Sequence, residues 1–198
     1  MKTFRVVVWL AIAVLGGYLA WHTVGWTIRG GAVSSTGTAA IGGPFEAVRS
    51  DGSKITRADM LGRPHLVFFG FTFCPDVCPT TLYEAGQWLN ALGEDGDKVD
   101  VYFVSVDPER DTPQVLGEYL SAFDKRITGI TGTPEQVQKI AKNWRVFVEK
   151  KSTGDGPEDY TVNHTATTYL MDAEGHFQRS IAYGPPHTAW SDTPPYRM

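Results

Sequence analysis

Hydrophobic and polar positions divide the chain into four parts of different character. Residues 6–28 form one apolar run of about 23 residues, and roughly 20 are enough to cross a bilayer as a helix. Lys2 and Arg5 precede this run, whereas Arg29 alone follows it directly, a bias that places the N-terminus in the cytoplasm. We therefore predict a membrane anchor at residues 1–29, formed by a single transmembrane helix.

A cleaved signal peptide is the alternative interpretation of the same segment. No good small-x-small cleavage site follows the run, because Tyr18 stands at the third position before a cut after Ala20. The segment also lacks the Arg- and Ser-rich amphipathic character of a mitochondrial transit peptide, which indicates a bacterial chain. Under both interpretations the rest of the chain is exported, and we expect it on the periplasmic side of the inner membrane.

Residues 30–43 are small and polar without periodicity, a composition typical of a flexible tether. We expect the folded domain at residues 44–184 and an irregular Pro-rich tail at residues 185–198. Within the domain, runs of β-branched and aromatic residues alternate with segments whose apolar residues recur at helical spacing. The expected strands are 45–49, 55–56, 66–71, 99–106, 127–131, 145–150, 167–171 and 177–181, and the expected helices begin at Pro79, Pro113 and Pro134.

Strands that alternate with helices predict an α/β fold, in which helices flank a central mixed sheet. Helix starts are marked by Thr112, a candidate N-cap, and by the capping box of Thr133 and Gln136. Functional groups in such sheets gather where strands end and helices begin. A pair of cysteines at the start of the first helix after a sheet strand favours a thioredoxin-like fold.

Cys74 and Cys78 are the only two cysteines of the chain, and they stand where a predicted strand gives way to a helix. Pro79 suits the first helical position, which makes Cys78 the expected N-cap. The positive end of the helix dipole is then expected to lower the pKa of the Cys78 thiol. At this spacing the two sulfurs can bind one metal ion or close a small disulfide ring. A bridge across three residues constrains the unfolded chain little, so we favour functional thiols over a structural disulfide.

A third metal ligand would have to be a histidine in the folded domain. His65 begins the cysteine strand at its far end, and His176 falls in a hairpin turn. His22 lies in the predicted anchor and His187 in the tail. His164 remains, just before the strand at 167–171, although a lone histidine before a strand is more often structural.

Composition excludes several classes of function. The formal net charge is −4 and no cluster of Lys and Arg stands out, so nucleic-acid binding is not expected. Two cysteines are too few for a disulfide scaffold or for an all-cysteine zinc site.

Four segments together resemble the SCO/SenC family of thioredoxin-like copper proteins. They are FGFTFCPDVCPTTL at 69–82, SVDPERDTP at 105–113, GITGT at 129–133 and DYTVNHT around His164. The resemblance covers residues 42–183. It implies that Cys74, Cys78 and His164 bind one copper ion, as Cu(I) or also as Cu(II). Two thiolates and an imidazole suit Cu(I), a soft ion.

The same resemblance implies a role in cytochrome c oxidase assembly. The protein would deliver copper to the CuA site of oxidase subunit II, or reduce the cysteines of that site. Its partners would be subunit II and other copper chaperones or thiol reductases. Two further hypotheses stay open: a thiol–disulfide oxidoreductase in which Cys74 and Cys78 are catalytic, which would be an enzyme, and a redox or copper sensor.

The chain departs from the family pattern at three places. Asn163 replaces an Asp that often precedes the histidine, Phe73 stands where His is frequent, and the Pro-rich tail replaces a closing helix. Asp107 and Asp111 lie in a matching segment, where we interpret them as bracing a loop with Arg110 rather than as ligands.

Overall fold

The computed structural model describes residues 41–182. The predicted anchor, most of the predicted tether and the Pro-rich tail lie outside these residues. Among residues 41–182, none of the helices combines the length and apolar character needed to cross a membrane.

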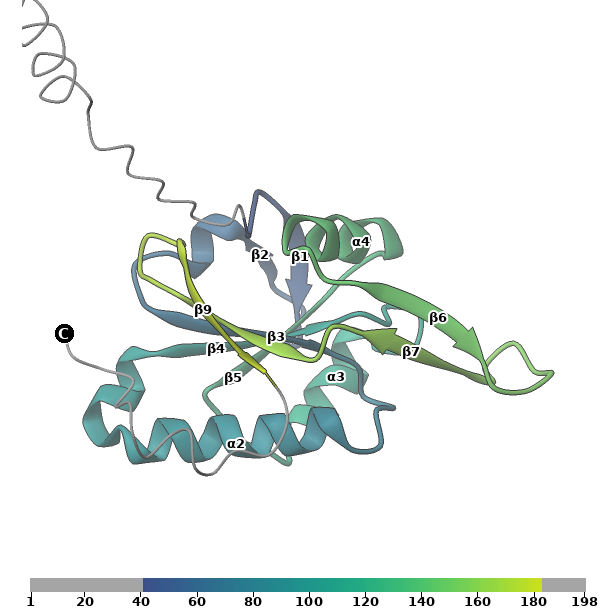
Figure 1. The fold of residues 1–198 in the computed structure, drawn as a ribbon, viewed down its shortest axis with the longest axis horizontal. Coiled ribbons are helices and arrows are strands. Elements are labelled where there is room, and N and C mark those ends of the chain that lie inside the picture. Colours follow the sequence, from purple (N-terminus) through teal and green to yellow (C-terminus); the bar gives the residue numbers. More distant parts are fainter. Residues whose placement is uncertain (1–40, 183–198) are drawn as a thin grey trace, which may run out of the picture. The chain divides into compact units, whose positions relative to one another are not determined.

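The described residues form nine strands, three α-helices and two short 3₁₀ helices (Figure 1). In chain order they are β1 Glu46–Arg49, β2 Lys54–Thr56, η1 Arg57–Met60, β3 His65–Gly70, α2 Val77–Ala91, η2 Gly93–Lys98, β4 Asp100–Ser105, α3 Pro113–Leu120, β5 Ile127–Thr131, α4 Pro134–Asn143, β6 Val148–Ser152, β7 Tyr160–His164, β8 Thr167–Met171 and β9 Phe177–Ala182.

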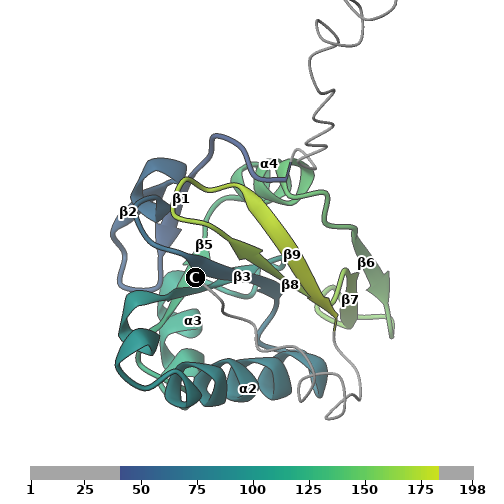
Figure 2. The ribbon, with the colours of Figure 1, turned by 60° about the vertical axis from the view of Figure 1, so that its left-hand side comes forward.

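Seven of the strands form one mixed sheet in the order β2-β1-β5-β4-β3-β8-β9. Strands β3, β4 and β5 are parallel and are connected through α2 and α3, whereas the outer strands pair antiparallel. Helices α2 and α3 cover one face of the sheet and α4 covers the other (Figures 1 and 2). This confirms the predicted α/β class with a central mixed sheet.

Strand β3 lies in the middle of the core, and all six of its residues are buried. Leu66 and Phe68 pack in the cluster that α2 and α3 cover, while Val67 and Phe69 pack in the cluster under α4. A parallel strand covered on both faces has no polar face, which is why this run is continuously apolar in the sequence. The cysteines follow its carboxyl end directly.

Local signals placed the starts of α3 and α4 correctly. The Thr112 hydroxyl accepts a hydrogen bond from the Val115 backbone N–H at 3.3 Å, with Pro113 as the first helical residue. Thr133 and Gln136 form the predicted capping box of α4. In both cases the cap satisfies backbone N–H groups that have no partner within the helix.

A second sheet of two strands, β6 and β7, extends beyond the main sheet (Figure 1). The strand expected at 145–150 begins only at Val148, and β7 was not expected at all. Tyr160 and Val162 are buried while Thr161 and Asn163 are not, so β7 has the alternation of a strand with one covered face. The pairing joins Val148 to His164 and Ser152 to Tyr160.

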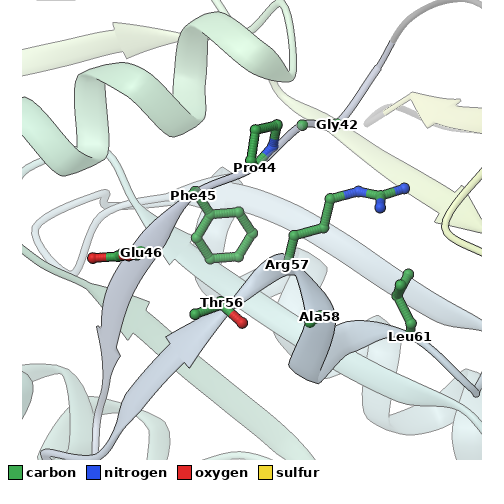
Figure 3. A pocket seen from close by; sticks show the side chains of 9 residues that line it. Gly42, Pro44, Phe45, Glu46, Thr56, Arg57, Ala58 and Leu61 are labelled. Carbon is green, nitrogen blue, oxygen red and sulfur yellow. The ribbon is translucent and has the colours of Figure 1, made fainter.

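The chain joins the fold slightly before Pro44, where the domain was expected to begin. The Gly42 backbone N–H donates to the Asn143 carbonyl at 3.0 Å, and Ile41 packs against the core. A shallow pocket of about 490 Å³ opens beside this entry, between Pro44, Phe45, Arg57 and Leu61 among others (Figure 3). Residues 41–43, assigned to the tether by their composition, are therefore in contact with the folded domain.

Candidate metal centre

The two cysteines lie on a short loop and on the first turn of the following helix. Cys74 is partly buried in the loop after β3, and its backbone N–H donates to the Phe71 carbonyl at 3.2 Å. Cys78 is fully buried in α2. Both are free thiols in the structure.

The N-cap of α2 is Asp76, so the prediction that Cys78 is the N-cap is wrong. The helix begins at Val77, with Cys78 as its second residue and Pro79 as its third. Proline lacks an N–H, but the N–H groups of a first helical turn have no partner within the helix, so the third position tolerates proline as well as the first. The pattern of proline alone could not distinguish these registers.

Gly70 closes strand β3 against the buried sulfur. A Cβ at this position would lie 2.7 Å from Cys78 Sγ and 2.6 Å from the Phe103 ring. Only glycine leaves room for the sulfur to pack under the end of the strand. The glycine in the sequence is therefore a signal of the close approach between the strand end and Cys78.

His164 is the last residue of β7, and it reaches the cysteines from a segment distant in sequence. Its Nε2 lies 3.9 Å from Cys78 Sγ, and its Nδ1 lies 3.1 Å from the Thr165 carbonyl oxygen. A carbonyl can only accept, so Nδ1 carries the hydrogen and Nε2 presents its lone pair to the sulfur. The Phe71 and Phe68 rings meet the imidazole edge-on, at 5.8 and 6.4 Å between centroids.

The electrostatics of the pair also differ from the sequence prediction, which assigned the lowered pKa to Cys78. A hydrogen bond from the Cys78 thiol holds the pKa of Cys74 well below its usual range. The same bond and burial raise the pKa of Cys78. Desolvation disfavours charge at the buried sulfur, so one thiolate and one thiol share the site.

The bracing role expected of the 107–111 segment is confirmed. Asp111 is wholly buried and accepts hydrogen bonds from the Thr72 N–H at 3.1 Å, the Thr72 hydroxyl at 2.6 Å and the Ser105 hydroxyl at 2.7 Å. Burial raises the pKa of Asp111. Asp107 pairs with Arg110 at 2.5 Å. These contacts tie the cysteine loop, residues 71–76, to the end of the sheet.

The other histidines described lie away from the cysteines, as expected. His65 is buried at the start of β3, with Nδ1 3.0 Å from the Arg63 carbonyl. His176 is exposed beside Asp172, on the turn between β8 and β9. His22 and His187 lie outside the described residues.

Asn163 does not orient His164. Its side chain is exposed and lies 3.4 Å from Glu149 Oε2. The backbone carbonyl of Thr165 holds the imidazole instead, so the departure at position 163 leaves the ring orientation intact. No residue type in the sequence could signal a backbone carbonyl in this role.

The donor set fits copper chemistry. The two sulfurs are soft ligands and imidazole nitrogen also suits copper. Cys78 is fully buried and Cys74 is partly buried. The three donor atoms are not all within 4.8 Å of one another. Within residues 41–182 that spacing is met by Asp172, Glu174 and His176, an exposed turn with hard oxygen ligands. Binding one ion therefore requires the Cys–Cys–His set to draw closer together.

Comparison with known proteins shows the family of this chain. The chain matches the SCO1/SenC family over residues 33–192. It is 40% identical over 154 residues to the mitochondrial protein SCO1 homolog 1 of Arabidopsis thaliana, which covers 77% of this chain and 45% of that protein. The chain spans about half the length of this relative and of the SCO2 and SCO1 proteins of Saccharomyces cerevisiae, which it also matches.

Solved structures with 39% and 48% sequence identity to this chain share its fold. ScoI of Bradyrhizobium japonicum with copper bound is 48% identical, with a TM-score of 0.68 over 71% of this chain and 88% of that one. Yeast Sco1 with copper bound is 39% identical, with a TM-score of 0.68 over 72% of this chain and 80% of that one. The likeness bears out the predicted thioredoxin-like fold. Because the family match extends over most of its length, the chain belongs to the SCO1/SenC family.

Proposed function

We propose that this protein binds one Cu(I) ion through Cys74, Cys78 and His164. The observation that carries the proposal is the approach of His164 Nε2 to Cys78 Sγ, with the other ring nitrogen bound to a carbonyl. This arrangement selects the tautomer that a metal requires and leaves the free lone pair facing a sulfur. Relatives of 39% and 48% identity were solved with copper bound, which supports the same ion here.

Copper is the cargo in this proposal. The Sco family is one of cytochrome c oxidase assembly proteins. The protein would be held in the bacterial inner membrane by residues 1–29, with its folded domain in the periplasm at the end of a tether. There it would pass copper to the CuA site of oxidase subunit II, after receiving the ion from another copper chaperone.

Anaerobic competition titration of the reduced full-length chain in detergent tests the copper site. We expect one Cu(I) per chain, with binding that collapses in Cys78→Ser and falls at least tenfold in His164→Ala. Asn163→Ala is a matched control on the same strand, since its side chain points away from the cysteines. Equal affinity in the unmodified chain and His164→Ala would contradict the assigned ligand set.

A second candidate function is thiol–disulfide exchange, and the unequal thiols favour it. The Cys74 thiolate would attack a disulfide of a partner protein and form a mixed disulfide, which releases one partner thiolate. Cys78, after losing its proton, would then attack Cys74 Sγ and release the second partner thiol. The chain ends oxidised as Cys74–Cys78 and the partner gains two electrons, so an external thiol reductase must restore the pair.

Substitution of His164 distinguishes the two functions. Reduction of a model disulfide by the reduced chain should survive His164→Ala if exchange is the function, whereas copper binding should not. Disulfide reduction is followed by mass spectrometry of alkylated partner thiols. A chain that binds Cu(I) tightly but reduces no disulfide would exclude the second candidate.

A further inference from the structure

The cysteines follow a strand inside the main sheet, whereas His164 lies on a hairpin outside it. The cysteine loop leaves β3, the most buried strand of the main sheet. His164 ends β7, which among the described strands pairs with β6 alone. The chain reaches β8 three residues after His164, so one end of β7 is held by connection to the main sheet. Along the rest of the β6–β7 hairpin, side-chain contacts must set its position relative to the cysteines.

Arg110 bridges these two segments. Its guanidinium carbon lies 4.6 Å from the centroid of the Phe73 ring and 3.8 Å from that of the Tyr160 ring. Phe73 directly precedes Cys74, and Tyr160 is the first residue of the strand that ends at His164. One planar cation therefore touches an aromatic ring from each ligand-bearing segment.

Hydrogen bonds fix the same guanidinium in place. Arg110 Nε donates to Asp107 Oδ2 at 2.5 Å, and Arg110 Nη1 donates to the Tyr160 carbonyl at 3.1 Å. The Tyr160 hydroxyl donates to the second oxygen, Asp107 Oδ1, at 2.8 Å. Asp107 thus uses both carboxylate oxygens to hold Arg110 and the hairpin together.

Burial strengthens the ion pair between Asp107 and Arg110. The Asp107 and Arg110 side chains are only 4% and 12% exposed, so water screens the pair weakly. Lys150 Nζ also lies 3.7 Å from the centroid of the Tyr160 ring, but this side chain is half-exposed and pairs with Glu109. A lysine at position 110 would lack the planar guanidinium group, which stacks on aromatic rings and donates hydrogen bonds in two directions. Arg110 therefore links the Tyr160 end of the hairpin to the cysteine loop.

We infer that Arg110, held by Asp107 and Tyr160, is a positioning residue that sets the distance between His164 and the two cysteines. The inference rests on the proposed copper function. Arg110 binds no copper itself; it fixes the hairpin so that the separated donor atoms can close on one ion. Its effect on copper affinity must therefore pass through His164.

A double-mutant cycle on the full-length chain tests this path. Cu(I) affinity is measured by anaerobic competition for Arg110→Met and Tyr160→Leu, each with His164 present and in the His164→Ala background. Supporting partners of a metal ligand typically contribute about 10- to 100-fold in affinity, so we expect a loss of at least about tenfold when His164 is present. In the His164→Ala background we expect no further loss. Tyr160→Phe keeps the ring under the guanidinium and should retain more affinity than Tyr160→Leu.

Arg126→Met is the matched control for a partly buried arginine. Arg126 pairs with Asp124 at 2.6 Å and Asp97 at 3.2 Å, beside the start of β5 and so at the opposite end of the parallel strands from the cysteines. The Arg126→Met variant should have a lower thermal unfolding temperature and an unchanged copper affinity. Tyr160→Leu leaves the Asp107–Arg110 pair in place, so it reports on the hairpin even if Arg110→Met fails to fold.

Amide hydrogen exchange of the copper-free chain gives a readout independent of the metal. Arg110→Met and Tyr160→Leu should speed exchange in β6 and β7 more than in β3. Equal copper affinity in the unmodified chain and His164→Ala would contradict the proposed site and the positioning role with it. A clear His164 effect with no loss in the Arg110 and Tyr160 variants, or an equal loss in both backgrounds, would contradict the positioning role alone.

Discussion

The main sheet and the β6–β7 hairpin support the same candidate site in different ways. Strand β3 is buried throughout, between parallel and antiparallel neighbours and under helices on both faces. Every residue of β6 is exposed, and its partner β7 has only two buried residues. The cysteines therefore follow the most buried strand of the described fold, while the histidine ends a strand of the least covered part. Such a division lets one ligand move while the other two stay in place.

Removing a core aromatic residue should have the largest effect and should separate the two regions most clearly. Phe69 is fully buried against the Trp144 and Tyr169 rings, so Phe69→Ala should lower the free energy of unfolding by about 4 kcal/mol. Phe147, which precedes β6, is 60% exposed, and Phe147→Ala should cost less than about 1 kcal/mol. Urea denaturation of the reduced chain measures both, and equal losses would contradict the contrast between the regions.

Replacing Asp111, the buried carboxylate under the cysteine loop, should have the next largest effect. Asp111→Ala leaves the Thr72 N–H and the Ser105 hydroxyl without their acceptor, which should destabilise the fold by about 3 kcal/mol and weaken Cu(I) binding. Asp111→Asn is the matched control. It keeps one acceptor oxygen, and the Thr72 hydroxyl can turn to accept from its amide, so its loss should be smaller. Denaturation and copper titration should rank the two variants alike.

Acid should weaken the main sheet through His65, which is buried at the end of β3 away from the cysteines. Burial lowers the pKa of His65, so the folded state keeps the ring neutral while the unfolded chain takes up a proton. Stability from this group is complete above the unfolded pKa near 6.5 and is lost as pH falls, by up to about 1.4 kcal/mol per pH unit.

Unfolding free energies at pH 7.5 and 5.5 check this loss by comparison with His65→Gln, in which the decrease should be smaller. His176→Gln is the control, since His176 is exposed. A pH dependence that His65→Gln leaves unchanged would show that other groups cause it.

Substitution at the exposed position next to the histidine should have the smallest effect. Asn163→Asp restores the residue that is frequent in the family. In this structure the Asn163 side chain points toward Glu149, and the Thr165 carbonyl orients His164. We therefore expect Cu(I) affinity to change by less than about twofold, because the side chain at position 163 is turned toward Glu149 within the hairpin rather than toward His164 or the cysteine loop. A tenfold gain would show that position 163 acts on the copper site after all.

Most of the fold was predictable from local sequence, for physical reasons that particular residues illustrate. The capping oxygens of Thr112 and Thr133 act within three residues, so their helices could be located without tertiary information. The apolar run of β3 reflects burial on both faces. Strand β7 was missed because only two of its residues are buried, which gives too short an alternation to recognise.

The candidate site was predictable in its residue types and in the proximity of its two cysteines. Cys74 and Cys78 are close in sequence and share one strand-to-helix junction, so their proximity followed from local structure. His164 lies 86 residues beyond Cys78, and its role came from a family resemblance rather than from spacing. The resemblance also marked the segment of Arg110, but nothing in it indicated that this residue would stack between Phe73 and Tyr160.

The sequence by itself determined the α/β class, the starts of α3 and α4 and the chemical nature of the donors, since these depend on periodicity, capping and side-chain type within a few residues. Tertiary structure alone decided which cysteine carries the charge, which carbonyl orients the histidine and how the hairpin meets the cysteine loop. Burial and hydrogen bonding between distant segments set those outcomes, because a pKa, a tautomer and a distance depend on neighbours that only folding brings together.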